Sequence, residues 1–169
     1  FIGLEIGSIS LYALAGLNRR DKLSNEASLK YFLLGSLASC IFIYGVALVY
    51  VSYSLMSVYD FALAIAYTGP DLIPLTTFIG VLLIFVGLLF KIAAAPFQSW
   101  APDVYQGSPT GYVGYMASVA KAASFIVISR ICMVSIRFIL EDFEPFFFAV
   151  IFLSVLVGSF FASIQTDLK

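Results

Sequence analysis

The sequence has no histidine and two cysteines, and charged residues make up only 11% of its 169 residues. A soluble domain carries about 25% charged residues, so this chain has too few to cover a surface that faces water. Its residues are 62% hydrophobic and its mean hydropathy is +1.03, and we infer that its solvent is lipid. A net charge of −1 provides no basic patch to neutralise phosphates, which excludes nucleic acid as a partner.

The residue types that metal and nucleophilic chemistry need are also missing. Without histidine, a Ser-His pair and haem ligation by histidine are excluded within this chain, and no Cys/Asp cluster has the spacing of metal ligands. Cys40 and Cys132 each lie in an apolar run and are interpreted as small core hydrophobes rather than as a disulfide or metal ligands. We therefore expect no metal site, no bound cofactor and no catalytic residue in this chain.

Long apolar stretches fill the chain, and a membrane helix needs about 20 such residues. They predict an all-α membrane protein with about five transmembrane helices in a single segment, residues 1–169. The approximate helix ranges are 1–17, 27–55, 74–102, 111–136 and 145–164. Because the chain starts at Phe1 without Met and ends as a polar stretch begins, we expect a fragment of a longer subunit or a split-gene product.

The third stretch, residues 74–102, is too long to cross a membrane as one straight helix. It would extend roughly 43 Å at about 1.5 Å per residue, whereas the hydrocarbon core is about 30 Å thick. Pro96 lies inside it and removes a backbone hydrogen bond. We therefore predict a helix broken over Lys91–Pro96, with a short second half that ends near Trp100 and a loop over residues 103–110. Such a break is tolerated where it lines a cavity or is buried in protein.

Three ionisable residues, Glu5, Lys91 and Lys121, lie inside apolar stretches. A charge in hydrocarbon is costly, so such residues usually face a wet interior and mark an ion or proton path. At the predicted break, freed carbonyls can solvate the ammonium of Lys91; the alternative is a lysine that snorkels to the interface. Lys121 has small neighbours that leave room for water, or it forms a structural salt bridge. Glu5 either tunes a relay or pairs with a lysine as a static strut.

Lys30 is a weaker candidate for the same path. Glu26 precedes it by four residues, which is the spacing of a helical ion pair. A salt bridge at the entrance of a helix therefore explains Lys30 as well as a relay role does.

The order of these residues resembles a known family. The run from Phe90 to Thr110, FKIAAAPFQSWAPDVYQGSPT, is similar to the signature of the antiporter-like membrane subunits of respiratory complex I, and among them to subunit 2 of NADH:ubiquinone oxidoreductase. The segments Gly3–Ile6, Glu26–Gly35 and Ser118–Ala123 match other helices of that family in the same order.

The resemblance implies a fold of two inverted five-helix repeats, each with a broken helix, of which this chain supplies most of the first. It implies that Glu5 and Lys91 form the central ion pair of a proton half-channel. Lys121 is then the next relay lysine, and Lys30 tunes the pair or gives protons access to it. Two channel-lining positions follow from the same comparison, Pro96 and Gln98. Many members have histidine where this chain has glutamine, and glutamine organises water but carries no proton charge.

The function that the resemblance implies is that of a proton-translocating membrane-arm subunit of NADH:ubiquinone oxidoreductase, an enzyme. FMN, iron–sulfur clusters and ubiquinone are then expected in other subunits, and the partners are other membrane-arm subunits, a chain that supplies the second repeat, and the lipid bilayer. The mitochondrial inner membrane is expected ahead of a bacterial plasma membrane. Two alternatives stay open: a subunit of a related multi-subunit cation/proton antiporter, and a structural remnant of the membrane arm that no longer conducts.

Overall fold

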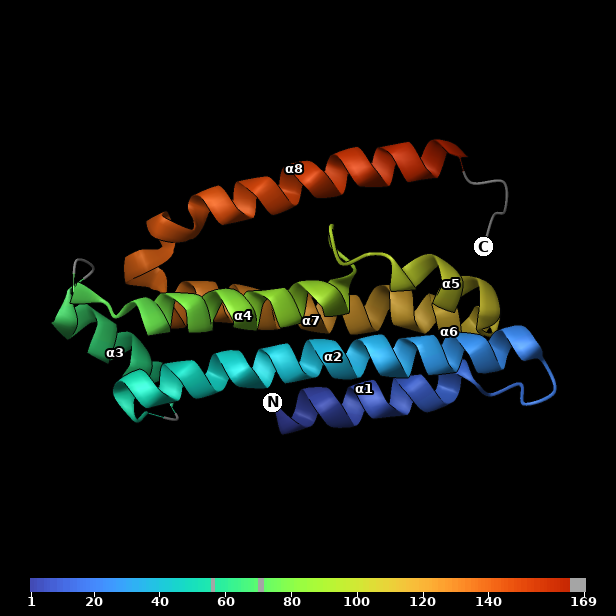
Figure 1. The fold of residues 1–169 in the computed structure, drawn as a ribbon, viewed down its shortest axis with the longest axis horizontal. Coiled ribbons are helices and arrows are strands. Elements are labelled where there is room, and N and C mark those ends of the chain that lie inside the picture. Colours follow the sequence, from blue (N-terminus) through green and yellow to red (C-terminus); the bar gives the residue numbers. More distant parts are fainter. Residues whose placement is uncertain (56, 70–71, 165–169) are drawn as a thin grey trace.

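The computed structural model describes residues 1–55, 57–69 and 72–164, and these residues form helices and their connections (Figure 1). The α-helices are α1 (Ile2–Ala15), α2 (Lys22–Tyr53), α3 (Val58–Thr68), α4 (Leu75–Ile92), α5 (Trp100–Gly107), α6 (Thr110–Tyr115), α7 (Lys121–Arg130) and α8 (Leu140–Ile164). Two π-helical turns, Met116–Ala120 and Ile131–Ser135, flank α7, and a 3-10 turn, Arg137–Ile139, leads into α8. The predicted all-α fold is confirmed.

The long helices run nearly parallel to one another, as a membrane bundle requires (Figure 1). Within the described residues, four helical segments are long and apolar enough to cross a membrane: Lys22–Tyr53, Leu75–Ile92, Thr110–Ser135 and Arg137–Ile164. The remaining predicted span corresponds to α1, an apolar helix of 14 residues. The chain is therefore an integral membrane protein in which α1 is shorter than the other spans.

Charged residues at two helix starts extend these helices beyond the predicted bounds. The Asp21 carboxylate accepts a hydrogen bond from the backbone N–H of Leu23 at 3.1 Å, so α2 begins at Lys22 rather than near residue 27. Glu141 and Asp142 lie in the first turn of α8, where acidic side chains stabilise the positive end of the helix dipole. That helix therefore begins at Leu140 and not at residue 145.

The third hydrophobic stretch is broken, as the sequence predicts. The α4 helix ends at Ile92, Ala93 adopts a left-handed conformation with φ of 57°, and regular helix resumes only at Trp100. The indole N–H of Trp100 donates to the backbone carbonyl of Phe90 at 3.0 Å, which ties the two halves together. The extent of the second half was predicted wrongly: α5 begins at Trp100 instead of ending there, and it includes residues 103–107, which were expected to be loop.

Two apolar clusters hold the bundle together. The first surrounds Trp100, which is 2% exposed and stacks on Tyr31 with ring centroids 4.6 Å apart. The second surrounds Phe85 and Phe143, both fully buried, where α4 meets the start of α8. The first cluster lies beside the break in the third stretch, so the packing around Trp100 holds the break in place.

The cysteines differ from their predicted place in the core. Both are free; Cys40 is exposed and Cys132 is half-buried against the second cluster. The buried face of α2 carries Tyr31, Gly35 and Ser39, and Cys40 points away from it. A thiol behaves as a small hydrophobe, so an outward position on a membrane helix suits it as well as a core position.

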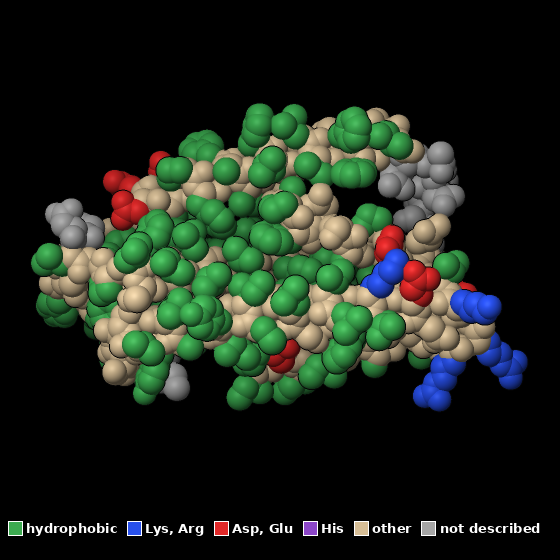
Figure 2. All heavy atoms as spheres, viewed as in Figure 1, with side chains coloured by type: hydrophobic (Ala, Val, Ile, Leu, Met, Phe, Trp, Pro, Cys, Tyr) green, Lys and Arg blue, Asp and Glu red, His purple; other side chains and the backbone are tan. Residues whose placement is uncertain are grey.

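The outer surface agrees with a lipid or protein environment. Figure 2 shows hydrophobic side chains spread over the sides of the bundle, with charged side chains gathered mainly toward its ends. The spans that contain α7 and α8 are each only 6% buried inside the described structure. These two helices therefore present most of their apolar surface to whatever surrounds the chain.

The close approach of α2 and α4 generates a first prediction. A methyl group on Gly45 of α2 would lie 2.5 Å from the carbonyl oxygen of Gly80 on α4. We expect Gly45→Ala to force the two helices apart and to destabilise the protein by about 1–3 kcal/mol, measured as a lower Tm in detergent. Gly114→Ala is the control, because a methyl group there meets open space. Equal Tm values for the two variants would contradict this view of the α2–α4 contact.

Candidate functional site

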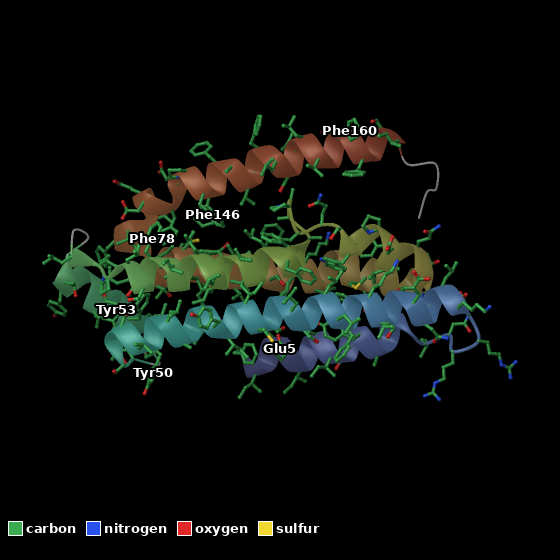
Figure 3. The ribbon with its side chains drawn as sticks, viewed as in Figure 1. Glu5, Tyr50, Tyr53, Phe78, Phe146 and Phe160 are labelled. Atoms are coloured by element: carbon green, nitrogen blue, oxygen red, sulfur yellow. The ribbon has the colours of Figure 1, made fainter. Side chains whose placement is uncertain are left out.

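The structure brings Glu5 and Lys91 together from helices that are far apart in the sequence. The ammonium of Lys91, in the last turn of α4, lies 3.0 Å from Oε1 of Glu5 on α1. Only 13% of the lysine side chain and 19% of the glutamate side chain are exposed. Figure 3 shows Glu5 between α1 and α2. The lysine side chain therefore does not snorkel to the surface of the bundle, because its charge is paired with Glu5 inside it.

Two serine hydroxyls complete this ion pair. Lys91 donates a second hydrogen bond to Ser8 Oγ at 2.6 Å, and Ser8 in turn donates to the backbone carbonyl of Leu4 at 2.8 Å. Ser39 of α2 donates to the carboxylate oxygen of Glu5 at 2.8 Å. The pair is thus fixed from three helices, α1, α2 and α4. Hydrogen bonds of this kind are what a buried ion pair needs to offset the loss of hydration.

The break supplies further polar groups beside Lys91. The carboxyl end of α4 carries the negative end of the helix dipole, which favours a cation in its last turn. Within the break, the backbone N–H of Ala95 donates to Ser154 Oγ on α8 at 3.0 Å. The freed backbone groups are therefore satisfied partly by side chains from neighbouring helices, as a break inside a membrane requires.

Two cavities border the break. The Lys91 cavity, about 470 Å³, is lined by residues of α1, α2, α4 and the helical stretch 115–124, among them Ser8, Tyr31, Lys91 and Ser124. The Lys121 cavity, about 560 Å³, is lined by the break, α5, Lys121 and α8. Its polar lining residues besides Lys121 are Gln98, Ser99, Asp103, Tyr105 and Gln106. The two lysines thus open into different cavities, and the break forms a wall of the second one.

Lys121 has a different kind of partner from Lys91. Its ammonium lies 5.6 Å from the centroid of the Tyr105 ring, within the range of a cation–π interaction. Among the residues that the structure describes, no carboxylate lies within 4.0 Å of its ammonium. The predicted alternative of a structural salt bridge at Lys121 is therefore not observed there. Lys121 also follows directly on the π-helical turn Met116–Ala120, a local irregularity that is frequent at functional sites.

The two predicted channel-lining positions, Gln98 and Pro96, differ in their surroundings. Gln98 lines the Lys121 cavity, and its side-chain oxygen is buried without a hydrogen-bond partner among the described residues. A polar atom in that position is suited to hold a water molecule. Pro96 lies in the break but is exposed, and it lines neither the Lys91 cavity nor the Lys121 cavity.

Lys30 lies apart from the other candidates, in a partly exposed cluster of charges. It forms the expected pair with Glu26 at 2.8 Å and a second one with Asp103 of α5 at 2.6 Å. The three side chains are between 44% and 57% exposed. The predicted salt bridge at the start of α2 is thus present, and its second acid comes from a helix that the sequence did not predict.

Three residues of this site were not predicted from the sequence: Ser8, Ser39 and Asp103. Ser8 follows Glu5 by three residues and so lies on the same helix face, a spacing that identifies it once Glu5 is known. Ser39 lies on the buried stripe of α2, four residues after Gly35. Asp103 carried no signal, because its partner Lys30 is 73 residues away in the sequence.

Comparison with known proteins adds a family to this geometry. The sequence profile described as NADH:quinone oxidoreductase/Mrp antiporter, transmembrane, matches residues 1–169. The chain belongs to this family. It is 44% identical over 171 residues to NADH-quinone oxidoreductase subunit N 1 of Solibacter usitatus and 46% identical over 175 residues to the protein of the same name from Chloroherpeton thalassium. Each comparison covers 100% of this chain, and 34% and 35% of the respective relative.

Two solved structures contain chains with the same fold. A chain of respiratory complex I from Thermus thermophilus superposes with a TM-score of 0.79 at 38% identity, over 99% of this chain and 34% of that one. A chain of an archaeal membrane-bound sulfane sulfur reductase superposes with a TM-score of 0.76 at 28% identity, over 89% of this chain and 30% of that one. This chain therefore spans about a third of the length of the family members that it matches.

The hydrogen bond from Ser39 to Glu5 generates a second prediction. In Ser39→Ala the buried carboxylate loses a donor, and because hydrogen bonds to charged groups contribute about 1.5–3 kcal/mol, we expect a loss of stability of that order. The measurement is the Tm of the purified protein in detergent. Ser36→Ala is the matched control: it lies one turn away on α2 and bonds only the carbonyl of Phe32 in its own helix. If both alanine variants melt together, Ser39 does not hold the carboxylate.

Proposed function

We propose that this chain forms the proton-translocating part of an antiporter-like membrane subunit of NADH:quinone oxidoreductase, in the place of subunit N. The observation that carries the proposal is the buried pair of Glu5 and Lys91 at a helix break bordered by two cavities. The relatives reported above are named subunit N, whereas the resemblance stated from the sequence alone was to subunit 2. We use the name subunit N for the proposed place of this chain in the complex. As part of that complex the chain belongs to an enzyme, but it carries out no redox step itself.

The proposed mechanism uses the ion pair as a control on the proton affinity of Lys91. While Glu5 stays at 3.0 Å, its negative charge favours the ammonium form of Lys91. When the carboxylate moves away or takes up a proton, the ammonium is left in a poorly solvated place and gives up its proton. That proton passes through water around the break to the amine of Lys121, so that Lys91 becomes neutral as Lys121 becomes charged.

The other candidates have supporting parts in this mechanism. Gln98, which lines the Lys121 cavity, holds water on the path but accepts no proton itself. Lys30, in its partly exposed charge cluster, tunes the electrostatic potential at the end of the proposed proton path. Pro96 interrupts the helix and so frees the backbone groups beside Lys91, without lining a cavity.

Assembly follows from the same proposal. Other membrane-arm subunits and the second repeat cover the exposed faces of α7 and α8, and FMN, iron–sulfur clusters and the quinone belong to other subunits, with no cofactor in this chain. The relatives reported above are bacterial, which favours a bacterial plasma membrane over the mitochondrial inner membrane that we expected from the sequence.

The family description also names Mrp antiporters, so a cation/proton antiporter is the second candidate. The names of the relatives and the 38% identity to a complex I chain favour the first candidate. Co-purification separates the two, because only the complex I subunit is expected to purify with flavin and iron–sulfur subunits.

Replacement of the ion pair tests the proposal directly. In membranes that contain the assembled complex, we expect Lys91→Met to abolish proton pumping and Glu5→Gln to lower it severalfold, since each removes one half of the control on proton affinity. The measurement is the pH gradient formed for each NADH oxidised, with the amount of assembled complex determined in the same membranes.

Lys22→Met serves as the control, because Lys22 is exposed at the start of α2. This substitution removes the same positive charge from the chain as Lys91→Met does. It is expected to pump normally. Normal proton pumping by the Lys91→Met variant in fully assembled complex would support the alternative that the chain is a structural remnant that does not conduct.

A further inference from the structure

Asp103 is the one described acidic residue that lies at both charged parts of the path. Its carboxylate binds Lys30 at 2.6 Å in the exposed cluster. The same residue lines the Lys121 cavity. Together with Gln106, one helical turn further along α5, it also lines a small hollow of about 80 Å³ beside Glu26 and Lys30. Asp103 therefore lies between the Lys121 cavity and the charged cluster at Lys30, at an end of the bundle where Figure 2 shows side chains of both charges.

Lys30 does not depend on Asp103 alone. Its ammonium also pairs with Glu26 at 2.8 Å, across one turn of the same helix. The cluster thus holds two carboxylates for one ammonium, and it keeps a pair if either carboxylate leaves. More than half of the Asp103 side chain is exposed, 52%, so packing leaves it room to change partner.

Lys121, in contrast, has no carboxylate partner within 4.0 Å in the described part of the chain. The charged and titratable groups that line its cavity with it are Asp103 and Tyr105, both from α5. The break and α8 contribute only uncharged residues to that lining. A proton that reaches Lys121 therefore creates a positive charge for which Asp103 is the available anion among the described residues that line the cavity.

We propose that Asp103 is a counter-charge shared between Lys30 and Lys121. With Lys121 neutral, Asp103 stays paired with Lys30, as in the structure. With Lys121 protonated, Asp103 turns into the cavity and balances the new charge, while Glu26 keeps Lys30 paired. Asp103 is thus a positioning residue for charge on the path, and this inference rests on the proposed function only for the source of the proton.

The experiment reads the charge of Lys121 separately from pumping. Amines react only when neutral, so the rate at which a small acylating reagent modifies Lys121 in the assembled complex, followed by mass spectrometry across pH, reports its proton affinity. In Asp103→Asn the ammonium loses its counter-charge. We expect the labelling midpoint to move about one pH unit lower, the small end of the effect of an opposite charge at short range, with labelling below the midpoint about tenfold faster.

Glu26→Gln is the matched control, since it also removes a carboxylate partner of Lys30 with similar exposure but does not line the Lys121 cavity. It is expected to move the labelling midpoint by much less than Asp103→Asn does, because Asp103 remains to balance Lys121. Asp103→Glu is expected to keep the midpoint near that of the unaltered protein. An equal shift in both amide variants overturns the proposal, because the effect would then come through Lys30. So does an unchanged midpoint in Asp103→Asn, or a Lys121 that is never labelled.

Pumping in the same membranes keeps this result distinct from a failure of the proposed function. If Lys91→Met stops pumping but Asp103→Asn leaves the labelling midpoint in place, only the shared counter-charge is refuted. If the midpoint moves but Lys91→Met pumps normally, the counter-charge is real and the proposed function is wrong. Should Asp103→Asn fail to assemble, Asp103→Ser is compared with Glu26→Ser: loss of the carboxylate must move the labelling midpoint further in the first variant than in the second.

Discussion

A charged pair inside an apolar bundle sets the demands that the rest of this structure meets. Taking the ammonium of Lys91 and the carboxylate of Glu5 out of water costs several kcal/mol for each ion, and their attraction offsets this only with good geometry and further hydrogen bonds. Both conditions are present: the atoms are 3.0 Å apart, and Ser8 and Ser39 each bond one partner. Three helices are therefore held in one arrangement around a single interaction.

The break in the third stretch follows from the same demand. If α4 continued as a regular helix past Lys91, the lysine would lie in mid-helix, away from the negative end of the helix dipole. Ending at Ile92 places it in the last turn, at that end, while the carbonyls of Leu89 and Phe90 accept hydrogen bonds from the backbone of the break. The aromatic cluster around Trp100 then restores the continuity that the break removes, because its indole binds the carbonyl of Phe90.

The sequence predicted this break because it leaves a local mark, a proline inside an apolar run that is too long. Lone charges in apolar surroundings marked Glu5 and Lys91 as buried ionisable groups, but their pairing with each other was implied only by the family resemblance. The sequence did not predict where α2 and α5 begin, since a single cap at Asp21 and a helical turn after Trp100 decide those bounds. It also missed contacts that depend on how helices meet. Ser39 and Glu5 are 34 residues apart, and Lys30 and Asp103 are 73 apart, and no periodicity along one helix records such a meeting.

The two lysines of the proposed path differ in their partners. Lys91 faces a carboxylate within hydrogen-bond distance, whereas Lys121 faces the ring of Tyr105, whose attraction for a cation is weaker than that of a full charge. With the Glu5 pair closed, the charge of Lys91 is therefore balanced by a full negative charge, whereas a charge on Lys121 is balanced only by the ring. Opening the pair changes the surroundings of Lys91 alone, so on the proposed function the position of one carboxylate controls which lysine holds the proton, and neither lysine has to travel.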